Sequence, residues 1–63
     1  MITIHIWTIR NKKGLTLKQL AELTGVSKSE INAIENGKVS PRLDTLELIA
    51  KGLDVSIYDL FTA

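Results

Sequence analysis

The stretch LTLKQLAELTGVSKSEINAIENGK, residues 15–38, contains the strongest structural signals in this sequence of 63 residues. Thr16 and Gln19 have the spacing of a capping box, in which two side chains satisfy free amides at the start of a helix. Gly25 is a typical helix stop, because glycine readily adopts the left-handed conformation that ends many helices. Between these signals, apolar residues recur at helical spacing, at Leu17, Leu20, Ala21 and Leu23.

A second helix follows almost at once. Ser27 with Glu30 repeats the capping signature, and Asn36 with Gly37 ends the helix after about Glu35. Because only a short turn separates this helix from the one before it, the two helices must cross at a steep angle. The stretch therefore predicts a helix-turn-helix.

Length and composition favour one small domain spanning residues 1–63. The chain has no cysteine and one histidine, so neither a disulfide nor a metal site is expected. Hydrophobic residues make up 44% of the sequence and aromatic residues 5%, which indicates an aliphatic core. No apolar run approaches the roughly 20 residues that span a bilayer, and no secretory leader is visible. We therefore expect a cytoplasmic protein without a membrane segment, cofactor or metal.

The charges are distributed unevenly, although the formal net charge is only +1. Residues 1–42 hold seven Lys or Arg against three Glu, a balance of +4, and residues 43–63 hold one Lys against four Asp or Glu, a balance of −3. A basic front with an acidic back suits an anionic partner on one side of the molecule.

The start of the chain allows two interpretations. The stretch ITIHI, residues 2–6, alternates apolar and polar residues as a strand does. At helical spacing, however, one side is lined by Ile2, Ile6 and Ile9. We favour a helix over about residues 3–13, ended by the basic residues and glycine at 12–14. This helix leaves Ile4 and Trp7 on the side opposite the core.

Two further helices are expected in the second half of the chain. Ser40 and Pro41 open a fourth helix that ends at Gly52, and its inward residues are Leu43, Leu46, Leu48, Ile49 and Ala50. Ser56 with Asp59 caps a fifth helix, which carries Ile57, Leu60 and Phe61. The predicted architecture is an all-α, five-helix domain in which the second and third helices form the helix-turn-helix.

The third helix has an outward face of small polar residues. At about 100° per residue, Ile31 and Ile34 face inward, and the outward positions are Ser29, Asn32, Ala33 and Asn36, with Lys28 beside them. Such a face fits the major groove of DNA, because short side chains permit close approach and amides match base edges. Lys28 can reach guanine O6 and N7, Asn32 can pair with adenine N6 and N7, and Ala33 can touch a thymine methyl. An ordinary solvent-exposed face is the alternative.

The segments LTLKQLAELTGVSKSEINAIENGKVSP and LDTLELIAKGLDVSIYDLF resemble the phage-repressor (Cro/Xre-type) helix-turn-helix family. The resemblance extends from about Ile2 to Phe61 and rests on a core motif of fixed spacing. It implies a lambda-repressor-like domain that binds double-stranded DNA as a homodimer, with the helix from Ser27 to Glu35 as the reader. It also implies a pseudo-palindromic site whose half-sites lie about 10 bp apart.

The resemblance also implies roles for particular residues. Base-reading positions are Lys28, Ser29, Asn32 and Ala33. Phosphate-binding positions are Thr16, Leu17, Asn36, Lys38 and Arg42. The dimer interface is expected to include Pro41, Arg42, Tyr58 and Phe61. Arg10 and Glu35 correspond to a partly buried ion pair, and we assign Arg10 to the scaffold rather than to direct DNA contact. The family often has Gln where this chain has Leu17, so one polar phosphate contact is missing.

An enzyme is not expected, because the sequence lacks a carboxylate pair placed for acid–base work and a Gly-rich loop for phosphate. The first hypothesis is a dimeric transcriptional regulator, either a phage-type repressor or a restriction–modification controller, without a small-molecule ligand. The second is an antitoxin or adaptor that binds another protein through Ile4, Trp7 and Tyr58. For Glu30, capping of the third helix is the first role and acceptance from cytosine N4 the alternative.

Overall fold

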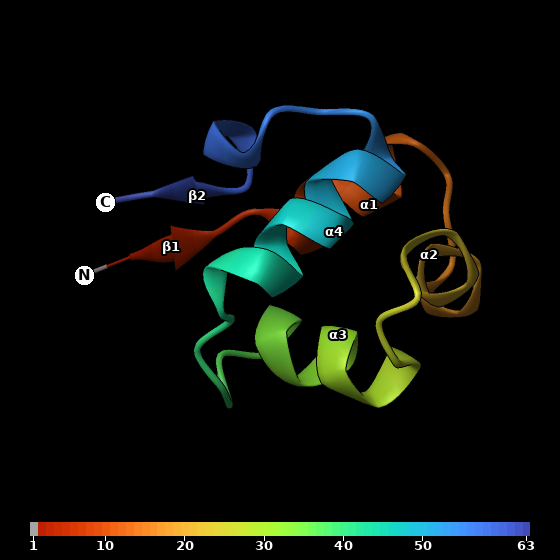
Figure 1. Ribbon diagram of the computed structural model, residues 1–63, viewed down its shortest axis with the longest axis horizontal. Coiled ribbons are helices and arrows are strands. Elements are labelled where there is room, and N and C mark those ends of the chain that lie inside the picture. The colour runs from red at the N-terminus through yellow and green to blue at the C-terminus, as the bar shows by residue number, and fades with distance from the viewer. Residues whose placement is uncertain (1) are drawn as a thin grey trace.

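The computed structural model describes residues 2–63. Along the chain, the elements are β1 (Thr3–Ile4), α1 (Ile6–Lys12), α2 (Leu17–Thr24), α3 (Lys28–Glu35), α4 (Leu43–Leu53), the 3-10 turn η1 (Ile57–Asp59) and β2 (Phe61–Thr62). The expected helical fold with a helix-turn-helix at α2 and α3 is confirmed (Figure 1). The expected count of five helices is wrong, because the described residues form four α-helices and a small two-stranded sheet.

The starts of α2 and α3 follow the expected caps. Thr16 Oγ1 accepts the Gln19 amide at 3.0 Å, and Gln19 Oε1 accepts the Thr16 amide at 2.8 Å, which completes a capping box. At α3, Ser27 Oγ accepts the Glu30 amide at 3.1 Å. The reciprocal bond, from the Ser27 backbone amide to the Glu30 carboxylate, is not formed, so α3 has only half of the expected capping box.

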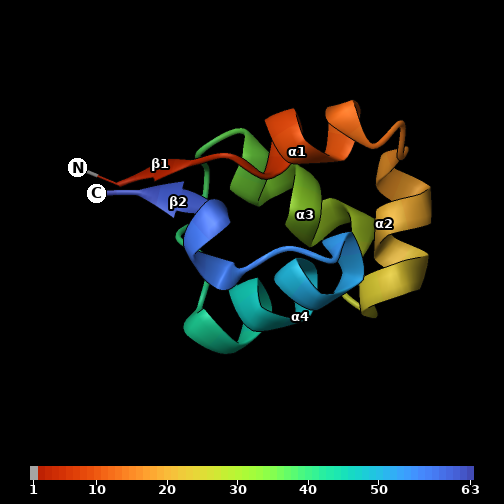
Figure 2. The ribbon, with the colours of Figure 1, turned by 90° about the horizontal axis from the view of Figure 1, so that it is seen from above.

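The expected helix over residues 3–13 is wrong at its start. Thr3 and Ile4 pair in antiparallel register with Thr62 and Phe61, at the end where both termini lie (Figure 2). β-Branched residues favour this extended conformation, and the distant partner strand satisfies backbone groups that a helix would satisfy locally. Ile4 is therefore half-buried against the core rather than on an open helix face.

The residues that flank β1 agree only partly with the sequence predictions. Ile2, expected on the inner side, is 62% exposed. His5 is the N-cap of α1, and its backbone N–H donates to the Leu60 carbonyl at 2.8 Å. Trp7 remains on the outside, as expected, and is 58% exposed.

The expected fifth helix is wrong as well. Ser56 and Asp59 form the predicted capping box, but they start only the single turn η1. The chain must become extended directly after this turn, because Phe61 lies in β2 opposite Ile4. Pairing with β1 therefore ends the helix that the local signals begin.

The fourth helix is shifted relative to the expectation. It begins at Leu43 rather than at Ser40 and Pro41, with extended Arg42 as its N-cap, and it ends at Leu53 rather than at Gly52. The residue after it, Asp54, has the left-handed conformation that closes the helix, with φ of 58°.

The inner face of α4 also differs from the expectation. Leu46, Ile49 and Ala50 are buried as expected, together with Thr45. Leu43 and Leu48 are exposed and do not line the core.

The core is almost entirely aliphatic. Its buried apolar side chains are Ile6, Leu20, Val26, Ile31, Ile34, Leu46, Ile49, Ala50, Leu53 and Leu60. Helix α2 packs on both α3 and α4, and Figure 2 shows α1 and α4 on opposite sides of the molecule. Leu23, expected in the apolar stripe of α2, is instead 58% exposed. None of the helices in residues 2–63 has the length and hydropathy needed to cross a membrane.

Candidate nucleic-acid interface

The outer face of α3 is open to solvent. Ile31 and Ile34 anchor the opposite face and are 0% and 1% exposed. The predicted base-reading face consists of exposed Lys28, Ser29 and Asn32 with half-buried Ala33. In Figure 1, α3 forms one edge of the molecule, and none of the described elements covers its outer side. The helix can therefore enter a groove without rearrangement of the core.

The turn between α2 and α3 fixes the angle of that face. Gly25 has φ of 77°, a left-handed conformation that favours glycine. Thr24 is 8% exposed, and its Oγ1 donates to the Leu20 carbonyl at 2.9 Å and accepts the Val26 amide at 3.1 Å. Val26 is itself buried, so the turn is pinned to the core at its centre. Sequence reasoning identified Gly25 but missed the role of Thr24.

The far end of α3 is held by Arg10 of α1. Its Nε and Nη2 donate to the two carboxylate oxygens of Glu35 at 2.8 and 3.0 Å. Its Nη1 donates to the Leu15 carbonyl at 2.9 Å. The two side chains are 10% and 3% exposed, so the guanidinium is part of the scaffold and is largely shielded from solvent.

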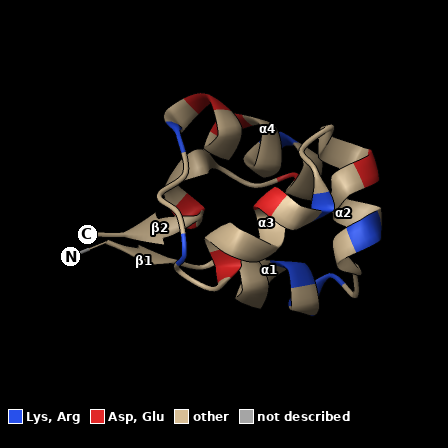
Figure 3. Cartoon of the chain, turned by 90° about the horizontal axis from the view of Figure 1, so that it is seen from below, with Lys and Arg blue, Asp and Glu red and all other residues tan. Residues whose placement is uncertain are grey.

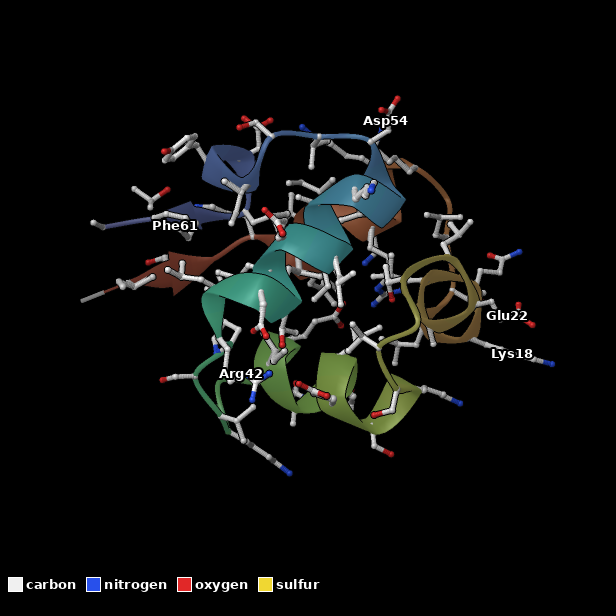
Figure 4. The ribbon with its side chains drawn as sticks, in the orientation of Figure 1. Lys18, Glu22, Arg42, Asp54 and Phe61 are labelled. Carbon is white, nitrogen blue, oxygen red and sulfur yellow. The ribbon has the colours of Figure 1, made fainter. Side chains whose placement is uncertain are left out.

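Basic groups surround the outer face. Figure 3 views the molecule from the side of α3 and shows basic segments on α1, on α2 and along the chain that joins α3 to α4. Acidic segments lie on α4, and also on α2 and α3. Lys28 starts α3, and Lys38 follows its end; both are exposed. Lys18 projects outward from α2 beside Glu22 (Figure 4). Lys18 was not among the residues singled out in the sequence, because one exposed lysine on a helix carries no distinctive signal.

Arg42 is already paired within the chain. Its Nε and Nη2 donate to Asp44 Oδ1 and Oδ2 at 3.1 and 2.8 Å, at the start of α4 (Figure 4). This hydrogen-bonded pairing raises the pKa of Arg42 and lowers the pKa of Asp44. Both side chains are largely exposed, so the pair is easily opened by a competing phosphate.

The start of α2 presents backbone rather than side-chain donors. Leu17 is half-buried against the core, so its side chain is directed inward. Thr16 and Gln19 use their amides in the capping box, but those of Leu17 and Lys18 lie in the first turn, where no helical acceptor exists. Free amides at a helix start are suited to bind an anionic oxygen.

The exposed side chains on the outer face also interact with one another. Asn36, which ends α3, donates through Nδ2 to Asn32 Oδ1 at 3.1 Å. The backbone amide of Asn36 donates to the Asn32 carbonyl at 3.0 Å. The two asparagines are therefore held together one turn apart on the same face.

A second, apolar surface lies where β1 and β2 meet the segment between α3 and α4. A groove of about 310 Å³ is lined by, among others, Ile2, Ile4, Val39, Pro41, Leu43 and Phe61. Leu43 in the groove and Tyr58 beside it are 73% and 78% exposed, and the Tyr58 and Phe61 rings lie 6.3 Å apart between centroids. Pro41, Arg42, Tyr58 and Phe61 were expected at an interface. Leu43 was not, because its spacing also fits a buried helix position and it was expected in the core.

Among residues 2–63, no three His, Cys, Asp or Glu side chains come together as metal ligands.

Comparisons with known proteins agree with this geometry. The family model HTH_3, described as a helix-turn-helix, matches residues 8–60. SinR of Bacillus subtilis, an HTH-type transcriptional regulator, is 41% identical over 61 residues, which are 95% of this chain and 55% of SinR. The structure of an HTH_3 family transcriptional regulator from Vibrio cholerae has a TM-score of 0.82 at 43% identity, covering 84% of this chain and 30% of that one.

The structure of the restriction-modification controller protein C.Esp1396I has a TM-score of 0.79 at 35% identity, covering 86% of this chain and 74% of that one. The chain spans about a third to about half the length of several curated relatives, at 29% and 55% in two of them.

Proposed function

The chain belongs to the HTH_3 helix-turn-helix family, and we propose that it is a transcriptional regulator that binds specific double-stranded DNA with α3 in the major groove. The observation that carries this proposal is the open outer face of α3, opposite the buried Ile31 and Ile34. A helix held on one side by the core and bare on the other fits the width of the major groove.

The proposed base readers are Lys28, Ser29, Asn32 and Ala33. Lys28 and Ser29 lie in the first turn of α3, and the first turns of recognition helices contact base edges in this docking geometry. Lys28 supplies donors for guanine, and Ala33 supplies a methyl for contact with thymine. Ser29 is short enough to leave room for close approach and can donate or accept.

The proposed phosphate contacts flank these readers. They are Thr16, Leu17, Asn36, Lys38 and Arg42. Leu17 acts through its backbone amide, since its side chain packs inward. Arg42 must release Asp44 to reach a phosphate, which its exposure permits.

A homodimer on a pseudo-palindromic site completes the proposal. A two-fold axis beside the apolar groove brings Pro41, Leu43, Tyr58 and Phe61 of one copy against the same residues of the other. The exposure of Leu43 and Tyr58 supports this arrangement, because burying both side chains in an interface would stabilise a dimer. Two copies then read half-sites about one helical turn apart.

The exposure of Trp7 supports a second candidate, an antitoxin or adaptor that binds another protein through α1. Ile4, expected in that surface, is paired in β1 with Phe61 and is half-buried. Without Ile4, the expected protein-binding surface is reduced to Trp7 on α1 and Tyr58 on η1. Because these two residues lie on separate elements, the DNA-binding proposal is favoured.

Selection of bound duplexes from a random pool, followed by titration of the best site, tests the proposed function. Asn32→Ala should weaken the best site by about 1–3 kcal/mol, because a base contact is lost, and should leave binding to random DNA nearly unchanged. Asn11→Ala is the matched control, since Asn11 is an exposed asparagine on α1 whose Nδ2 donates to the Trp7 carbonyl at 2.7 Å. A wild-type chain that enriches no sequence would exclude the proposal.

A further inference from the structure

The hydrogen bond between Asn36 and Asn32 restricts what Asn32 can offer to a base. Asn36 Nδ2 lies 3.1 Å from Asn32 Oδ1, and the amide of Asn36 is tied to the Asn32 carbonyl at 3.0 Å. Both residues are exposed, so the bond is on the surface that the proposed function places in the groove. The backbone bond keeps the two residues one helical turn apart, within reach of a side-chain hydrogen bond.

This hydrogen bond determines which group of the Asn32 carboxamide is available to a base. An asparagine side chain has one oxygen that accepts and one NH₂ group with two donors. With Oδ1 turned toward Asn36, one turn along the helix, the torsion about the Cβ–Cγ bond is set. The NH₂ group is the part of Asn32 that remains without a partner within residues 2–63. A freely rotating asparagine uses both ends of the amide and pairs with adenine N6 and N7.

We infer that Asn36 is a positioning residue that turns Asn32 into a donor, so that Asn32 selects guanine, through O6 and N7, over adenine. Guanine presents two acceptors in the major groove, whereas adenine presents one acceptor and one amino donor. The inference rests on the proposed function and changes two of its details. Asn32 reads guanine rather than adenine, and Asn36 acts mainly on Asn32 rather than on a phosphate.

The experiment compares base preference at one position of the best duplex. Selection from a random pool with the wild type and with Asn32→Ala identifies the base pair whose preference disappears in the variant. Four duplexes that differ only at this pair are then titrated. The wild type should prefer guanine to adenine there by roughly tenfold, the size of a good base contact.

Variants of Asn36 separate positioning from general binding. Asn36→Ala frees the amide, so the guanine-to-adenine ratio should fall to about twofold or less. Asn36→Asp can only accept, so it should draw Asn32 Nδ2 inward, expose Oδ1 and reverse the ratio toward adenine. Asn36→Gln keeps an amide donor, so this variant should retain the wild-type preference for guanine.

The matched control is Lys38→Ala, which should weaken all four duplexes equally and leave the ratio unchanged. The added negative charge of Asn36→Asp also weakens all four, so only the ratio is compared.

The outcomes test the positioning role of Asn36 separately from the proposed function. An unchanged ratio in Asn36→Ala, in a chain whose thermal unfolding matches the wild type, overturns the positioning role and leaves the proposed function standing. A wild-type preference for adenine at this pair also overturns it. Failure of the wild type to enrich any sequence overturns the proposed function itself, and the inference with it.

Discussion

Arg10 and Glu35, 25 positions apart in the sequence, form a bidentate ion pair that joins α1 to the last residue of α3. The third guanidinium donor used, Nη1, binds the carbonyl of Leu15 just before α2. One side chain therefore joins α1, the segment before α2 and the end of α3. Among the described residues, no buried side-chain nitrogen or oxygen lacks a hydrogen-bond partner.

Glu35→Ala should lower the free energy of unfolding by about 3–5 kcal/mol, because it leaves the Arg10 charge buried without its partner. This is a large part of the stability of a small domain. Urea unfolding measures the loss, and Glu22→Ala, at an exposed site on α2, is the control. Adding Arg10→Met should recover much of the stability, since no charge is then stranded. Equal melting of Glu35→Ala and the wild type would contradict the structural role of the pair.

The close contact between Gly52 and Thr24 limits how near α4 can lie to α2. A Cβ added at Gly52 would overlap Thr24 Cγ2. Gly52→Ala should therefore destabilise the fold by about 1–3 kcal/mol through overpacking, reduced by the better helix propensity of alanine.

Thr24→Ser provides the matched test of that contact, because it removes Cγ2 and keeps the Oγ1 hydrogen bonds of the turn. In the Thr24→Ser background, Gly52→Ala should be neutral or stabilising. The difference between the two backgrounds is the coupling energy of a double-mutant cycle. A coupling energy near zero would show that the two helices relax without cost.

Local signals predicted the parts of the fold that local interactions form. The caps at Thr16, Ser27 and Ser56 are all present, because each joins residues two or three positions apart. The pairing of Ile4 with Phe61 joins the two ends of the chain, and no local pattern contains it. That pairing replaced one turn of the first helix and most of the fifth.

In the candidate site, too, the sequence predicted the features set by local spacing and not those set by distant elements or by side-chain hydrogen bonds. The inward and outward faces of α3 follow from helical spacing, and the positions of Ile31 and Asn32 agree with it. Leu43 was assigned to the core because its spacing on α4 fits an inward position, and this assignment is wrong, since the side chain is 73% exposed. The hydrogen bond of Asn36 to Asn32 was equally hidden, because spacing brings two asparagines together but does not show which groups bond.

Lys38→Ala should weaken binding to all duplexes alike. Lys38 is exposed just after α3, where the proposed docking places a phosphate. Loss of one phosphate contact should reduce the slope of log affinity against log salt by about one unit. Lys51→Ala is the control, since Lys51 is an exposed lysine on α4 outside the proposed DNA surface. Identical slopes for the wild type and Lys38→Ala would remove this residue from the interface.

Asp44→Asn should strengthen binding to DNA of any sequence. The carboxylate holds Arg42 at 2.8 Å, and a neutral amide there holds it more weakly, so a phosphate competes for the guanidinium more easily. The pKa of Asp44 is lowered from its ordinary 3.8, mainly by the hydrogen bond from Arg42, so the pair is intact at neutral pH and is lost only as the pH falls through that lowered value.

The salt dependence of Asp44→Asn should therefore become steeper by up to about one unit. Glu47→Gln is the control, because Glu47 is an exposed carboxylate on the same helix and its neutralisation frees no arginine. If both variants change the affinity equally, the effect is one of net charge and not of Arg42.

Leu43→Glu should produce a monomer. Leu43 borders the apolar groove with Phe61 and is 73% exposed in the single chain, so a carboxylate there costs little in the monomer and opposes burial in a dimer. Sedimentation of the wild type should show dimers that dissociate on dilution, and the variant should sediment as a monomer at every concentration.

Two exposed residues elsewhere provide the controls for that variant. Leu23→Glu changes an exposed leucine on α2, and Trp7→Ser removes the apolar centre of the alternative, protein-binding surface on α1. Both should remain dimeric if the groove is the interface, whereas a monomer produced by Trp7→Ser would place the interface on α1. Because two linked half-sites bind more tightly than one, Leu43→Glu should also reduce affinity for a two-half-site duplex by about 100-fold or more. Its affinity for a single half-site should fall much less, because the residues on α3 that read the site are untouched and only one negative charge is added beside Arg42.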